Sequence, residues 1–182
     1  MKTTDNNIIA CTCATLLTFL AVGSFFHGCG KSTDPDKPLI NKVSMSQDFN
    51  VTGGDKFSIP IYFENNKPIA ALSLPLHYPS DLMRCDSVSF VGGRCEKFFL
   101  NRYFTRHDTI QVGSIDTLGV GAGSGLCATL HFWVFGNAPD TNVSIDLLVN
   151  PTLPFGFSDT SLTAETIIPQ FEAGRIHINS QL

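Results

Sequence analysis

Two segments, 69–78 and 126–135, alternate strongly apolar and less apolar residues with a period of two. Successive side chains of a β-strand point to opposite faces, so this period places one face of each segment in a hydrophobic core. The apolar sides are formed by Leu72, Leu74, Leu76 and Tyr78 in the first segment, and by Leu126, Ala128, Leu130, Phe132 and Val134 in the second. Helical packing requires a period near 3.6 residues, so the pattern restricts both segments to strands.

The rest of the chain after residue 38 follows the same pattern, with turn signals every 8–12 residues and no helical period. We expect an all-β fold, an antiparallel β-sandwich with jelly-roll topology and about nine strands. Apolar residues make up 43% of the chain, which is enough for a core. The strands are predicted at 43–51, 57–63, 69–78, 87–91, 98–104, 109–116, 126–135, 143–149, 161–166 and 175–178.

The N-terminal part of the chain has the composition of an export segment. A charge-free run with an apolar centre between Ile8 and Phe26 ends at Gly28-Cys29, and a polar, proline-rich stretch follows. This resembles a bacterial lipoprotein signal, in which Cys29 is acylated and becomes the mature N-terminus. An ordinary signal peptide or an uncleaved transmembrane anchor is the alternative. We therefore predict an export segment at 1–29, a linker at 30–38 and one domain at 39–182, placed at the cell surface or in the periplasm.

The cysteines of the predicted domain fit an oxidising compartment. Cys85 and Cys95 flank a Gly-Gly pair and either form a disulfide or remain free thiols, and Cys127 is left over. No Cys-x-x-Cys or Cys/His spacing of a zinc site is present. We expect no metal site on this chain.

Several function classes lack their sequence signals. The net charge is −4 and no Lys/Arg cluster exists, which disfavours nucleic-acid binding. The glycines of 119–125 resemble a phosphate loop, but a strand rather than a helix follows them. The histidines are scattered, and no Gly-x-Ser-x-Gly motif occurs. We expect a protein that is not an enzyme and has no cofactor.

The domain resembles cohesins in its segments 51–63, 69–78, 111–119, 125–134 and 174–178. The resemblance implies a nine-stranded jelly roll with one flat face that docks a dockerin, a small calcium-loaded helical module carried by an enzyme. It implies a non-catalytic receptor that holds dockerin-bearing, polysaccharide-degrading proteins. Calcium would then belong to the partner rather than to this chain.

The family pattern also assigns contact positions. The outward positions of the third cohesin strand fall on Ala71 and Ser73, and Phe104 lies in the fifth strand. The sixth strand and its exit supply Gly113, Ile115, Asp116 and Leu118. Phe104 is expected to contribute the most binding energy of these residues, unless its side chain turns inward to fill the sandwich. Pro75 departs from the pattern, because proline removes a backbone donor from a strand that the family places centrally.

A second face offers an alternative function. His131, Trp133 and Phe135 lie on the side of their segment opposite the core, together with Cys127, and Tyr62 points outward from a neighbouring strand. Exposed aromatic rings on a flat sheet are typical of carbohydrate-binding modules. A structural or adhesive surface role is a further alternative, as is a covering loop that hides these rings.

Overall fold

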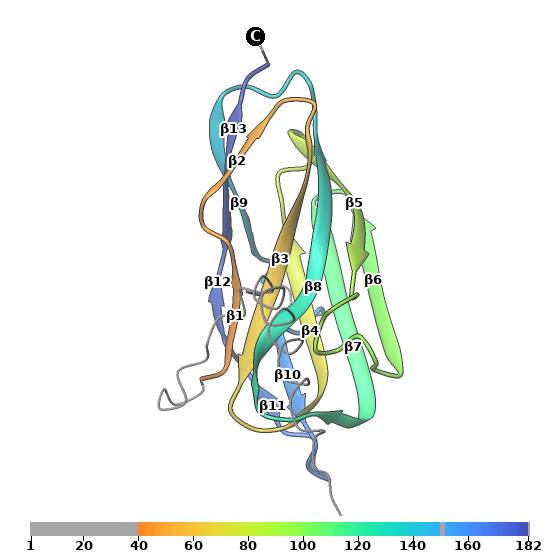
Figure 1. The fold of residues 1–182 in the computed structure, drawn as a ribbon. Helices are drawn as coiled ribbons and strands as arrows, with labels where there is room; N and C mark the ends of the chain where they lie inside the picture. The colour runs from red at the N-terminus through yellow and green to blue at the C-terminus, as the bar shows by residue number, and fades with distance from the viewer. Residues whose placement is uncertain (1–39, 150–151, 182) are drawn as a thin grey trace, which may run out of the picture. The chain divides into compact units, whose positions relative to one another are not determined.

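The computed structural model describes residues 40–149 and 152–181, which lie in one compact unit, Pro38–Leu182. These residues form two layers of β-strands (Figure 1), with no helix in the described ranges. The expected β-sandwich is thereby confirmed. The predicted export segment, its Cys29 and the linker lie outside the described residues.

The first sheet has the strand order β12-β1-β3-β8-β5. Its members are β12 (Gln170–Glu172), β1 (Lys42–Met45), β3 (Lys56–Asn65), β8 (Gly123–Val134) and β5 (Met83–Ser89). All pairs are antiparallel except β1 with β12, which is parallel. The long β3–β8 pair forms the centre of this layer.

The second sheet has the order β11-β10-β4-β9-β13-β2, and β7 joins it by pairing with β4 and β6. Its members are β2 (Phe49–Thr52), β4 (Ile69–His77), β6 (Leu100–Arg106), β7 (Thr109–Val120), β9 (Thr141–Leu147), β10 (Gly156–Asp159), β11 (Thr166–Ile167) and β13 (Gly174–Asn179). The β13–β2 pair is parallel, so the expected fully antiparallel sandwich is corrected at two strand pairs.

The core lies between the two layers and follows the predicted alternation except at Leu126, which was predicted on the core side. A register shift in β8 pairs Leu126 with the outward Tyr62, so Leu126 is only partly buried and lies outside the core. Leu74 and Val112 of one sheet and Ile59 and Leu130 of the other are fully buried. Burial of such side chains is worth about 1.5–3 kcal/mol each. Aromatic pairs also bridge the layers, as where the Tyr78 and Phe132 rings meet edge to face at 5.5 Å.

Some predicted boundaries were wrong. The expected strand 43–51 is two strands, because the chain changes from one sheet to the other between Met45 and Phe49. The expected strand 161–166 is mostly a turn, and β10 lies before it at 156–159. Pro154 and Gly156 are turn signals, yet Gly156 begins a strand with φ of 153°. A Cβ at this glycine would lie 2.8 Å from the carbonyl oxygen of Ile167, so a side chain is excluded there.

Pro75 is tolerated in the central strand β4 because of a gap on one side of that strand. Its carbonyl oxygen accepts a hydrogen bond from the Leu148 amide, so its nitrogen also points toward the edge where β9 and β10 pair. On this edge the pairing of β4 with β9 begins at Leu76, and its pairing with β10 ends at Ser73. Pro75 lies between these two pairings, so the fold requires no strand-to-strand hydrogen bond from its nitrogen, which carries no hydrogen.

The segment 90–99, which leads into β6, is fastened by Arg94. The guanidinium donates to Asn65 Oδ1 and Gly123 O at 2.7 Å and to Gly121 O at 2.6 Å. It also lies 4.5 Å from the centre of the Phe63 ring. Burial lowers the pKa of this guanidinium. The glycines that follow β7 thus hold an arginine rather than a phosphate, and Gly125 leaves the room that the Arg94 side chain fills.

β7 is interrupted by a bulge at 116–119. It advances from Ile115 to Val120 while its partner β4 advances only from Ala71 to Ile69. The bulge closes at Gly119, whose φ is +69° and whose Cβ, if present, would lie 2.5 Å from Ile69 O. Only glycine satisfies both conditions.

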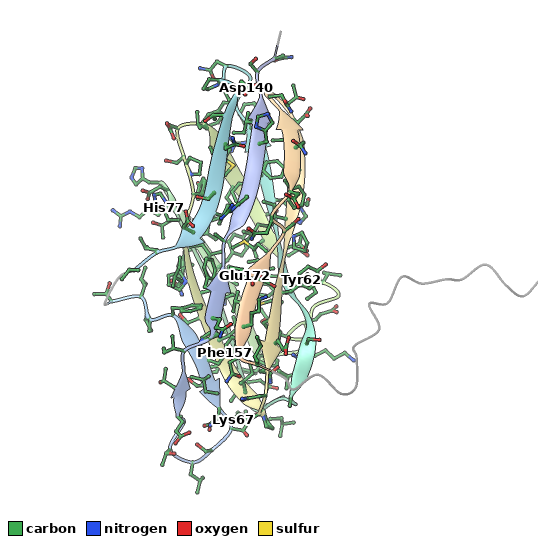
Figure 2. All side chains as sticks on the ribbon, turned by 90° about the vertical axis from the view of Figure 1, so that its left-hand side faces the viewer. Tyr62, Lys67, His77, Asp140, Phe157 and Glu172 are labelled. Carbon is green, nitrogen blue, oxygen red and sulfur yellow. The ribbon has the colours of Figure 1, made fainter. Side chains whose placement is uncertain are left out.

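Lys67, in the turn between β3 and β4 (Figure 2), ties this turn to the end of β10 and to the segment that follows it. Its Nζ lies 2.8 Å from Asp159 Oδ2 and 2.8 Å from Glu165 Oε2. Asp159 Oδ1 accepts further hydrogen bonds from the Ser161 amide and hydroxyl and from the Glu165 amide. The hydrogen bonds from Lys67 and then Ser161 lower the pKa of Asp159 from 3.8 to about 2.

The cysteines of the described domain are free and buried. Cys85 and Cys95 are not bonded to each other, so the disulfide that the sequence left open is absent from this structure. Cys127, expected on the outer side of its strand, is fully buried instead, because segment 90–99 packs on β8 there. Burial raises the pKa of the Cys85 and Cys95 thiols to about 12, and that of Cys127 as well.

Candidate docking face

The outer surface of β6, β7 and β4 is built from four cross-strand rows, which we call the β6–β7–β4 face. Side chains of β7 alternate, so that Ile110, Val112 and Ser114 are buried while their neighbours point away from the core. The strand register then fixes the rows, which are Leu100–Ile115–Ala71, Arg102–Gly113–Ser73, Phe104–Gln111–Pro75 and Arg106–Thr109–His77. Pro75, at the β4 end of its row, is buried. Adjacent positions along each row are about 5 Å apart.

Large apolar side chains are exposed on this face and at its end. Phe104 is 71% exposed, Ile115 49% and Leu118, in the adjoining bulge, 88%. Gly113 leaves a low point between Arg102 and Ser73, since no side chain rises from the middle of that row. Exposed aromatic and aliphatic groups gathered on one flat sheet are typical of a protein-binding surface.

The middle of the face is fastened to the segment after β9. Gln111 Nε2 donates to Ser73 Oγ at 2.9 Å, and this hydroxyl donates in turn to Pro154 O. Ser73 is consequently half-buried and already hydrogen-bonded within the fold. The register of β6 is held from its inner side, where Asn101 donates to Cys95 O and accepts from Ser114.

The β6–β7 turn closes the other end of the face. His77 Nε2 lies 3.2 Å from Asp108 Oδ2, and both side chains are about half exposed. The Thr109 hydroxyl and His77 lower the pKa of Asp108 by hydrogen bonding and charge. The Tyr78 hydroxyl donates to His107 O at 2.6 Å, which anchors the turn to the core.

Comparisons with solved structures find this architecture in cohesin modules. A non-cellulosomal cohesin from the archaeon Archaeoglobus fulgidus superposes with a TM-score of 0.64 at 19% identity, covering 78% of this chain and 93% of that one. The seventh ScaB type I cohesin of Pseudobacteroides cellulosolvens gives 0.65 at 17% identity, covering 79% and 94%. The cohesin in the Coh-OlpC–Doc435 complex of Clostridium thermocellum gives 0.63 at 18%, covering 78% and 95%. This domain has the cohesin fold.

The sequence alone is far from these modules. No family model matches the chain, and the comparison with curated proteins finds no match either. What this domain shares with the cohesins is therefore the arrangement of its strands, while few of its residues are identical to theirs.

The cohesin fold brings most of the predicted contact residues together. Ala71, Ser73, Phe104, Gly113 and Ile115 all lie on the β6–β7–β4 face. Asp116 and Leu118 lie beside it in the β7 bulge, where Asp116 Oδ1 accepts a hydrogen bond from the Thr117 amide. Phe104 is exposed, so the alternative in which it fills the core is excluded.

The sequence reasoning missed three outward residues of β6, namely Leu100, Arg102 and Arg106. The signal was present, because all three share the alternation of Phe104 in the segment 100–106. The predicted strand 98–104 ended at Phe104, so Arg106 was left outside it.

The aromatic rings of the other sheet are engaged with neighbouring groups. The Arg84 guanidinium lies over the Trp133 ring at 5.2 Å, and Phe135 meets it edge to face at 5.3 Å. Trp133 Nε1 donates to Gly54 O at 3.1 Å, and His131 Nδ1 is 2.7 Å from the Ser58 hydroxyl. A sugar ring that stacked on Trp133 would have to displace the arginine.

Tyr62 does not join these rings in one platform. It is 43% exposed on β3, but Trp133 lies opposite Lys56, six positions away along the same strand. At about 3.3 Å per residue the two rings are separated by roughly 20 Å, with Pro60 and Thr129 between them. Tyr62 is thus separate from the other three residues of the alternative carbohydrate site, of which Trp133 and Phe135 are in contact.

Within the described ranges, no group of three or more His, Cys, Asp or Glu side chains is placed to hold a metal ion. Among the same residues no helix is long and apolar enough to cross a membrane. A shallow hollow over β2, β9 and β13 is lined largely by polar side chains, among them Asn50, Asn142 and His177. The exposed apolar groups on β6 and β7 lie outside this hollow.

Proposed function

We propose that this chain is a non-catalytic receptor module that captures a dockerin-type protein module through the β6–β7–β4 face. The observation that carries the proposal is the exposed Phe104 on the edge strand β6 of that face, 71% accessible between two further outward side chains of β6. Most of the apolar surface of this ring is still in water, so a partner that covers the ring would bury more of that surface than the fold does.

The comparisons support the same proposal. Structures with this fold include cohesins solved together with dockerins, among them the Coh-OlpC–Doc435 and Coh-OlpA–Doc918 complexes of Clostridium thermocellum. The partner of this chain would carry the calcium and, in the wider proposal, a polysaccharide-degrading enzyme. The chain itself would supply the rigid sheet and no reacting group.

The proposal is tested with the purified domain and a panel of calcium-loaded dockerin modules, including Doc435 and Doc918. Calorimetry or surface plasmon resonance should detect saturable binding of at least one module, and a calcium chelator should abolish it by unfolding the partner. No binding across the panel would reject the proposal. Retention on insoluble polysaccharide that Trp133→Ala removes would support the carbohydrate alternative instead.

We also propose that the domain is held outside the cytoplasmic membrane by a lipid on Cys29. The support is the apolar run that ends at Gly28-Cys29 and the polar stretch that follows it. Such a tether would hold the receptor where extracellular enzymes can reach it. Cys29→Ala should release the protein from the membrane fraction of expressing cells, and continued membrane association would favour the transmembrane-anchor alternative.

A further inference from the structure

The β6–β7–β4 face carries positive charge without a matching negative charge. Arg102 and Arg106 point outward from β6, one on each side of Phe104 along the strand. Both are exposed, and neither forms an ion pair with any of the described residues. None of the residues in the four rows is an aspartate or a glutamate.

Nearby carboxylates of the described residues form no ion pair with these arginines. Asp108 in the adjoining turn is paired with His77 and accepts a hydrogen bond from Thr109. Asp116 lies past the opposite end of the face, in the β7 bulge. The chain as a whole has a net charge of −4, so the stripe of positive charge formed by Arg102 and Arg106 is opposite in sign to the net charge of the chain.

The spacing of the stripe defines what can cover it. Arg102 and Arg106 are four positions apart on one strand, or about 13 Å at roughly 3.3 Å per residue. On a helix laid along β6, residues seven positions apart lie on one face and are separated by about 10.5 Å at 1.5 Å per residue. Two carboxylates at this spacing would reach both guanidinium groups and leave an apolar residue midway over Phe104.

Resting on the proposed capture of a dockerin-type module, we propose that the β6–β7–β4 face selects a partner helix with two acidic residues about seven positions apart and an apolar residue between them. The acidic part of the helix lies over Arg102, Phe104 and Arg106. Its apolar continuation extends toward Leu100, Ile115 and Leu118, so the charges also fix the direction in which the helix docks. The charge selects the partner, while the apolar groups supply most of the binding energy.

The test uses a dockerin module that binds in the panel experiment, prepared in two forms. One form carries Glu at two exposed positions seven apart in its docking helix, and the other carries Lys at the same positions. The wild-type domain should bind the Glu form about tenfold or more tightly than the Lys form, with faster association at low salt. The double variant R102E/R106E should reverse this preference.

A matched control separates the local effect from net charge. The variant K56E/R175E makes the same change in total charge at two exposed residues outside the face, and it should keep the wild-type preference. Circular dichroism and thermal melting confirm that each variant is folded, because charges on an edge strand such as β6 also discourage strand pairing.

The outcomes distinguish the two proposals. Equal binding of the Glu and Lys forms, unchanged in R102E/R106E, would overturn the charge selection and leave the capture function standing. The same loss of preference in K56E/R175E and R102E/R106E would also overturn it, since total charge would then be the cause. Failure of every module to bind wild-type domain would reject the capture function and the inference with it.

Discussion

Replacing Phe104 by alanine should weaken capture of a dockerin module strongly while leaving the fold nearly intact. A phenylalanine side chain offers about 200 Å² of surface, and 71% of Phe104 is exposed. A partner that covers it would remove about 140 Å² of apolar surface from water, worth up to about 3.5 kcal/mol at 25 cal/mol per Å². Alanine retains part of this contact, so we expect a loss of about 2–3 kcal/mol, or roughly 30-fold or more in Kd.

The cost to folding should be small, because less than a third of the ring is covered within the domain. We expect a loss of no more than about 1 kcal/mol in the free energy of unfolding. Calorimetric titration with the bound module and urea unfolding measure the two quantities separately. Tyr62→Ala serves as the control, since it removes an exposed aromatic ring from the other sheet and should not change Kd.

Two results would refute this reasoning. An unchanged Kd in a folded Phe104→Ala protein would show that the partner does not cover this ring. A loss of about 3–5 kcal/mol in unfolding free energy, the usual cost of removing a buried phenylalanine, would show that the ring packs inside the sandwich.

Three further predictions concern the fold. The pKa of Asp159 is lowered from 3.8 to about 2, so its ion pair with Lys67 stabilises the domain above about pH 4 and this contribution is lost as the pH falls toward 2. In urea unfolding at several pH values, Asp159→Asn should be less stable than wild type at pH 7 and equal to it below pH 2. Gly119→Ala should cost about 2 kcal/mol or more, because φ is +69° and the new Cβ would meet Ile69 O at 2.5 Å, whereas at Gly121 nothing lies within 4 Å and alanine should change the urea midpoint little. The three buried thiols of the described domain should be unreactive toward a thiol reagent at pH 8 in the native protein and all react after denaturation, since burial raises their pKa values; a smaller count in the denatured state would reveal a disulfide.

The strand pattern of the sequence was enough to predict the two-layered sandwich, and the cohesin resemblance supplied the residues expected on the candidate face. Leu72, Leu74 and Leu76 alternate with Ala71 and Ser73, and this period alone decides which set is buried. The cohesin resemblance then located Phe104, although only the structure showed that its ring is exposed. Local alternation fixes faces because it depends only on neighbouring residues in one strand.

Long-range contacts decided what the sequence left open. Segment 90–99 covers Cys127 because Arg94 reaches carbonyl groups after β7, and the sequence contains no sign that these distant residues meet. The hydrogen bonds of Ser73 with Gln111 and Pro154, and the guanidinium of Arg84 over Trp133, likewise join residues far apart in the chain.

The amino-acid sequence by itself determined where most of the strands lie and which side of the central strands is apolar, since both follow from the two-residue period of the extended backbone. Only the tertiary structure decided which strand lies beside which, and hence that Arg102, Phe104 and Arg106 form one exposed stripe next to Gly113 and Ser73. The reason is physical: strand pairing joins segments that are separated along the chain through backbone hydrogen bonds, and the backbone is the same at every residue. Its register is therefore set by the packing of the whole sandwich rather than by any short stretch of sequence.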